Sequence, residues 1–112
     1  MSIKKKEDSG VGVAEPKTKQ KPKLARPRVY KVLLHNDDYT PMEFVVLVLK
    51  QVFNKSDADA MSIMLHAHTR GYAVAGVYSF EIAETKVQET MALADQSGFP
   101  LLCTMEPEDA PQ

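Results

Sequence analysis

The 112-residue chain has little of what marks secreted, membrane-spanning or disulfide-rich proteins. Cys103 is the only cysteine, so no internal disulfide can form and a reducing compartment is the simplest expectation. No apolar run approaches the roughly 18 residues that span a bilayer. The basic residues near the start are not followed by the apolar segment of a secretory signal. We therefore expect a cytosolic protein without a membrane partner.

The charge of the chain is distributed unevenly. Residues 1–28 carry nine Lys or Arg against three Asp or Glu, whereas residues 29–112 carry five against twelve. The basic segment is rich in Lys, Gly and Pro and has no aromatic residue, so it cannot bury enough apolar surface to offset the entropy of ordering it. We predict a flexible N-terminal extension at residues 1–27, one globular domain at residues 28–107, and a short C-terminal tail at residues 108–112.

The Lys-rich extension raises the question of a nucleic-acid partner. No aromatic residue is interleaved with the lysines to stack on bases, and the rest of the chain is acidic. A solvated tether is the simpler interpretation. We therefore expect no nucleic-acid partner.

Hydrophobic periodicity predicts three strands and three helices in the globular part. The strands are expected at residues 29–35, 71–80 and 100–105, and the helices at residues 41–53, at residues 57–70, and from Ser79 and Glu81 to about residue 97. The order is β-α-α-β-α-β. We predict an α+β fold with two layers, in which the helices cover one face of a small, mainly antiparallel sheet of three strands.

Capping residues place the starts and ends of the helices. Thr40, Pro41 and Glu43 fit the N-cap, first and third positions of a helix, which together predict a capping box. Ser56 is the expected N-cap of the second helix and Gly71 its C-terminal stop. Gly76, inside the second strand, predicts a β-bulge or a close approach of another group.

The second helix carries an apolar stripe at helical spacing. Met61, Met64, Leu65 and His68 follow the i, i+3, i+4, i+7 pattern, so we expect them to share its buried face. His68 is then either a satisfied core histidine or a ligand-binding one, and spacing alone leaves both open. His66 is two residues away and points to another side of the helix, so the two imidazoles cannot hold one metal ion. We expect no metal site.

Motifs for catalysis are absent. The sequence has neither a Gly-x-Ser-x-Gly elbow nor a glycine-rich phosphate loop. Cys103 falls in a short apolar strand, where a buried and unreactive thiol is usual. Asp37 and Asp38 are adjacent in a predicted loop and diverge, which does not suit a pair of acid and base. We therefore expect no catalytic residue, no cofactor and no enzymatic activity.

A cluster of hydrogen-bond acceptors follows the first strand. Asn36, Asp37 and Asp38 offer oxygens, a neutral His68 offers a ring nitrogen, and no Lys or Arg stands in the loop. The alternative is that these groups build an Asx turn and cap the next helix. That explains one or two of them, because Thr40 is expected to take the N-cap. The surplus predicts a binding site for a cation that carries several donors.

Four segments together resemble one protein family. They read VLLHNDDYTPMEFV, IMLHAH, GVYSFEIAETKV and PLLCTMEPE, in this order. The resemblance covers about residues 28–107. They are similar to the bacterial ClpS adaptors and, in part, to the substrate-recognising region of eukaryotic N-recognin ubiquitin ligases. The resemblance implies a monomeric β-α-α-β-α-β domain that docks on the N-domain of the ClpA unfoldase. It also implies delivery to the ClpAP protease of proteins that begin with Phe, Tyr, Trp or Leu.

The resemblance also implies roles for individual residues. Asn36, Asp37 and His68 would bind the α-amino group of the substrate, assisted by Asp38 and Thr40. The pocket for the first side chain would be lined by Met42, Val45, Met64, Ala67 and Leu101. Glu81 and Lys86 match positions that contact ClpA. Ala67 departs from the family pattern, in which Val is usual at this position, and would leave a roomier pocket.

Overall fold

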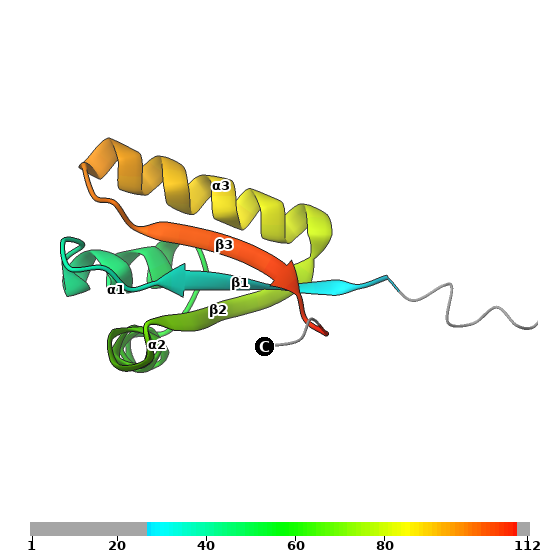
Figure 1. Ribbon diagram of the computed structural model, residues 1–112, viewed down its shortest axis with the longest axis horizontal. Coiled ribbons are helices and arrows are strands. Elements are labelled where there is room, and N and C mark those ends of the chain that lie inside the picture. The colour runs from blue at the N-terminus through cyan, green and yellow to red at the C-terminus, as the bar shows by residue number, and fades with distance from the viewer. Residues whose placement is uncertain (1–26, 110–112) are drawn as a thin grey trace, which may run out of the picture.

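The computed structural model describes residues 27–109 and has the predicted order of elements (Figure 1). The strands are β1 (Val29–His35), β2 (Tyr72–Ser79) and β3 (Leu102–Pro107), and the helices are α1 (Met42–Gln51), α2 (Asp57–Arg70) and α3 (Phe80–Ser97). The α+β fold class is confirmed. The predicted N-terminal extension lies almost wholly outside the described residues, as do the last three residues of the predicted C-terminal tail.

Strand β1 lies at the centre of an antiparallel sheet of order β2-β1-β3. Leu34 is paired with Ala73 on one side and Cys103 on the other, and all three side chains are buried. A bulge interrupts the pairing of β1 with β2 between Val32 and Leu33. Beyond the end of β1, where the acceptor cluster begins, the Asn36 N–H donates to the Gly71 carbonyl at the end of α2.

Gly76 lies directly beside this bulge and is also a close-approach point. A Cβ atom at Gly76 would overlap the ring of Tyr78, with the Cζ atom only 2.6 Å away. Any side chain at this position would displace the aromatic ring. The prediction for Gly76 is therefore confirmed in both respects.

All three helices contribute to one core on one face of the sheet. Its largest fully buried members are Val32 and Leu34 of β1 and Val48 and Leu49 of α1. Met64 of α2 and Ala83 of α3 also belong to it. Because side chains alternate along a strand, Leu33 points to the opposite face and lies outside the core cluster. No helix among the described residues is long and apolar enough to cross a membrane.

The predicted capping box at the start of α1 is wrong. The helix begins at Met42, Pro41 is the N-cap, and no side chain caps it. The Thr40 hydroxyl donates instead to Oδ2 of Asp37, at 2.7 Å. A hydrogen bond to an ionised carboxylate is stronger than a neutral capping bond, so Thr40 is drawn into the preceding loop.

The ends of α2 agree with the prediction, but its buried face does not. Ser56 accepts a hydrogen bond from the Asp59 N–H at 3.1 Å, and Gly71 ends the helix at φ 97°. Met64 is buried, whereas Met61, Leu65 and His68 are exposed. The face toward the core consists of Ala60, Met64 and Ala67. Both sets of residues have helical spacing, and the set with two small alanines allows the helix to pack closely.

Candidate functional site

A cavity of about 210 Å³ opens where β1 ends, between α1 and α2. Its lining brings together all ten residues for which the sequence implied substrate binding, with Leu34 and His35 in addition. The full set is Leu34, His35, Asn36, Asp37, Asp38, Thr40, Met42, Val45, Met64, Ala67, His68 and Leu101. The roles of these residues remain predictions, but their assembly around one cavity is a property of the fold.

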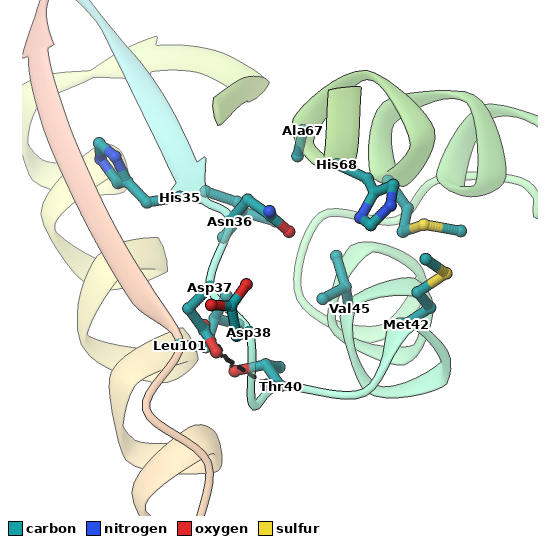
Figure 2. A pocket seen from close by; sticks show the side chains of 12 residues that line it. His35, Asn36, Asp37, Asp38, Thr40, Met42, Val45, Ala67, His68 and Leu101 are labelled. Atoms are coloured by element: carbon teal, nitrogen blue, oxygen red, sulfur yellow. Dashed lines mark hydrogen bonds between the residues drawn. The ribbon is translucent and has the colours of Figure 1, made fainter. Parts of the chain in front are cut away.

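Three side chains form the polar wall of the cavity: Asn36, Asp38 and His68. Figure 2 shows the Asn36 amide, at the end of β1, pointing toward the His68 imidazole on α2. The N–H of Asn36 donates to the Gly71 carbonyl at 2.8 Å, which ties the end of β1 to the end of α2. Among residues 27–109, none of these three side chains has a hydrogen-bond partner. The interpretation of His68 as a core histidine is therefore wrong.

Asp37 organises the loop below this wall. Its Oδ1 accepts the N–H groups of Tyr39 at 2.8 Å and Thr40 at 2.7 Å, and its Oδ2 accepts the Thr40 hydroxyl. Partial burial acts to raise the pKa of Asp37, but these hydrogen bonds outweigh it and the pKa is lowered. Asp37 is therefore ionised at neutral pH and contributes negative charge beside the cavity.

Across residues 27–109, no Lys or Arg lines the cavity to balance this charge, and Asp38 is exposed. Asp37 accepts three hydrogen bonds from its own loop, an arrangement that the sequence did not predict. The remaining surplus of acceptors is the polar wall, and it suits a cation with two or three donors.

The opposite part of the cavity is apolar. Met64, Ala67 and Leu101 are buried and form its floor, together with half-buried Val45. Met42 is 44% exposed and stands at the mouth. A bound group with one charged and one apolar end would thus find both ends matched within a single cavity.

Two lining residues were missed by the sequence reasoning. Leu34 belongs to the core. Its position two residues before Asn36 is a signal that could have placed it at the cavity. His35 points away from Asn36 toward β3 (Figure 2), and its Nε2 lies 2.7 Å from the Thr104 hydroxyl. The His35 side chain is engaged with the sheet, so its part in the lining is peripheral.

Glu81 and Lys86, the predicted docking residues, lie on α3 outside the cavity lining. Glu81 is exposed in the first turn of the helix. Lys86 is half-buried; its Nζ donates to the Val52 carbonyl at 2.7 Å and lies 5.8 Å from the centre of the Tyr78 ring. Glu81 is thus accessible to a partner, whereas Lys86 is engaged within the domain.

The described residues offer little else for chemistry. Within this part of the chain, no group of three His, Cys, Asp or Glu side chains could hold a metal ion. Burial raises the pKa of the Cys103 thiol to about 12, so it is a poor nucleophile. His66 is exposed and does not line the cavity.

Comparison with known proteins gives one consistent family. The family described as "ATP-dependent Clp protease adaptor protein ClpS" matches residues 25–104. The ClpS adapter proteins of Phenylobacterium zucineum and Desulfatibacillum aliphaticivorans are both 56% identical; the aligned regions cover 95% and 96% of this chain and 98% and 100% of theirs. The structure of Agrobacterium tumefaciens ClpS2 bound to L-phenylalaninamide is similar with a TM-score of 0.72 and 52% identity, covering 74% of this chain and all of that one.

Proposed function

The chain belongs to the ClpS family of ATP-dependent Clp protease adaptors, and we propose that it captures proteins by a bulky hydrophobic N-terminal residue and delivers them to the ClpA unfoldase of ClpAP. The preferred first residues are Phe, Tyr, Trp and Leu. The single observation that carries the proposal is the cavity, in which unengaged acceptors stand beside an apolar floor.

The polar wall is suited to bind a free N-terminus. An α-ammonium group has three N–H donors and is mostly cationic at neutral pH, since its ordinary pKa is about 7.7 to 8. An internal peptide nitrogen has one donor and no charge. Asn36, Asp38 and His68 supply three acceptors, and the Asp37 carboxylate adds negative charge. This difference in donors and charge distinguishes an N-terminus from the rest of a polypeptide.

The apolar floor fits the first side chain. The structural relative from A. tumefaciens is described as bound to L-phenylalaninamide, a molecule with a free amino group, a benzyl side chain and an amide in place of the next peptide bond. We propose the same arrangement here, with the benzyl group against Met64, Ala67 and Leu101. Met42 at the mouth would crowd a substrate Cβ with two branches, which disfavours Ile and Val.

The expected affinity is modest. Two or three hydrogen bonds to charged groups contribute roughly 1.5 to 3 kcal/mol each. Burial of a Leu or Phe side chain adds about 1.5 to 3 kcal/mol. The costs of association and ordering reduce this sum to a dissociation constant on the order of micromolar. A grip of this strength allows an adaptor to release what it delivers.

The docking partner that we propose is the N-domain of ClpA. Family membership supports a Clp protease partner, and exposed Glu81 at the start of α3 is accessible on a surface away from the cavity. Substrate and unfoldase could then be held at the same time. We assign Lys86 a supporting role at this surface, because its ammonium group is bonded to Val52.

One titration tests the proposal. A fluorescein-labelled peptide beginning with Phe is titrated in two forms, with a free and with an acetylated amino group, and anisotropy is measured. We expect micromolar binding of the free form and at least a hundredfold loss on acetylation. His68→Ala should abolish binding of the free form, and His66→Ala is the matched control that should retain it. Equal binding of both forms would instead indicate a protein-interaction domain without a pocket for N-termini.

A further inference from the structure

The outer face of α2 carries an apolar stripe that the core does not use. Met61 and Leu65 are 47% and 49% exposed, and His68 follows Leu65 by three residues on the same side of the helix. The spacing i, i+4, i+7 is that of a buried stripe, yet the core contacts of α2 are made by Ala60, Met64 and Ala67. The stripe is therefore accessible to a bound partner.

The stripe is continuous with the cavity. His68 belongs both to the stripe and to the polar wall, and Met64 of the floor is one helical turn from Met61. Exposed Met42 lies on the same side of the cavity as His68, across from the Asn36 amide (Figure 2). Apolar surface thus extends from the mouth of the cavity onto α2.

The proposed function fixes where a bound chain must leave. The α-amino group occupies the polar wall and the first side chain occupies the floor, so the carbonyl side of the first residue must exit through the remaining rim. The exposed side chains of the lining are Asn36, Asp38, Met42 and His68, and only Met42 is apolar. The chain therefore exits over Met42, beside the His68 end of α2.

Resting on that function, we propose that Met61 and Leu65 form a second subsite, which binds apolar side chains at the residues that follow the N-terminal one. The dimensions agree. From His68 to Met61 the helix rises about 10 Å at about 1.5 Å per residue. An extended chain spans at most about 3.3 to 3.6 Å per residue, so the second and third residues of a substrate, together with their side chains, reach along most of this length.

The subsite adds a preference and leaves the requirement for a free N-terminus unchanged. Extra contact with two half-exposed side chains should improve the affinity for peptides with apolar second and third residues by about fivefold. Peptides with polar second and third residues would lack this increase in affinity but would still bind through the first residue. Among substrates with the same first residue, the adaptor would thus prefer those whose second and third residues are apolar.

The test compares two peptides that share a free N-terminal Phe and differ only in the next two residues, Leu-Leu or Ser-Ser. Anisotropy titrations use the full chain with wild-type sequence, the double variant Met61→Gln/Leu65→Gln, and the control Ile82→Gln on α3, where Ile82 is 50% exposed and outside the cavity lining. Circular dichroism confirms that each variant is folded, and the two single variants replace the double variant if it is not.

Wild type and Ile82→Gln should prefer the Leu-Leu peptide by about fivefold, and the double variant should bind both peptides within twofold of each other. All three proteins should bind the Ser-Ser peptide equally. A preference that survives in the double variant, or no preference in wild type, would overturn the subsite. Failure of every protein to bind the Ser-Ser peptide would contradict the proposed function itself, so the two failures are distinguishable.

Discussion

Asp37 stabilises the loop beside the cavity through its ionised form. Its carboxylate accepts two backbone N–H groups and the Thr40 hydroxyl. These bonds lower its pKa below the ordinary value of 3.8. A carboxyl whose folded-state pKa is lowered contributes stability above its unfolded-state pKa and loses it as the pH falls through the folded value. The contribution of Asp37 is therefore present at neutral pH, begins to decline near the ordinary pKa of about 4, and is lost as the pH falls through the lower folded-state pKa.

The substitution Asp37→Asn tests this role. We expect the free energy of unfolding to fall by about 1 to 2 kcal/mol at pH 7, because the amide cannot accept all three bonds. The matched control is Asp38→Asn, which removes the same charge from an exposed side chain and should cost less than about 0.5 kcal/mol. Urea denaturation at pH 7 and pH 3 measures both. A penalty for Asp37→Asn that is as large at pH 3 as at pH 7 would contradict the assignment.

Most of the residues that line the cavity could be named from the sequence, but the hydrogen-bond partners of each could not. The acceptor cluster could be predicted because Asn36, Asp37 and Asp38 exceed what one turn needs. Which carboxylate is hydrogen-bonded within the loop depends on the direction of the Thr40 hydroxyl, and only the three-dimensional structure determines that direction. The expectation that His68 shares the buried face of α2 was wrong because two stripes on this helix have helical spacing, and only packing against the sheet decides between them.

At the scale of elements, the ends of helices were predictable where a side chain or a glycine acts locally. Ser56 and Gly71 bound α2 as expected, since their effects depend on a few neighbouring residues. The C-terminal end of α1 is held differently, by Lys86 of α3, which lies 34 residues beyond Val52. No local pattern reveals such a contact. It joins the end of α1, the helix that carries Met42 and Val45, to α3.

Lys86→Met should show what this contact contributes. Methionine keeps much of the apolar stem near Tyr78 but leaves the Val52 carbonyl without its charged donor, so we expect a loss of about 1 to 2 kcal/mol in the free energy of unfolding. Lys50→Met is the control. Lys50 pairs with Asp57 at the exposed surface, and its loss should cost less than about 1 kcal/mol. Equal losses in chemical denaturation would show that Lys86 is an ordinary surface lysine.

At the scale of the whole molecule, the site is a product of topology. The cavity needs the end of β1, the start of α1, the end of α2 and the segment before β3 to meet at one end of the sheet. The order of elements was predictable from periodicity, and the antiparallel sheet follows from it. The polar wall depends on the register of β1 with β2, which pairs His35 with Tyr72 and so places Asn36 beside Gly71 at the end of α2. Sequence patterns do not specify that register.

We expect different parts of the chain to carry substrate binding and delivery. Within residues 27–109, the cavity is lined by residues between Leu34 and Leu101. We therefore expect deletion of residues 1–20 to leave peptide affinity within twofold of the full chain. Degradation by ClpAP of a test substrate beginning with Phe should nevertheless fall severalfold. The reason is compositional, since a Lys-rich segment with little apolar surface is suited to act as a tether that the unfoldase can engage.

Two measurements on one preparation check this separation: peptide anisotropy, and the rate of loss of the substrate in the presence of ClpA, ClpP and ATP. A control in which residues 1–20 are replaced by a Gly-Ser segment of equal length distinguishes length from sequence. If the control restores delivery, the extension acts as a tether of sufficient reach; if it does not, the Lys-rich sequence itself is recognised. Unimpaired delivery by the deleted chain would remove the extension from the mechanism and leave the α3 surface around Glu81 as the part of the chain that engages the unfoldase.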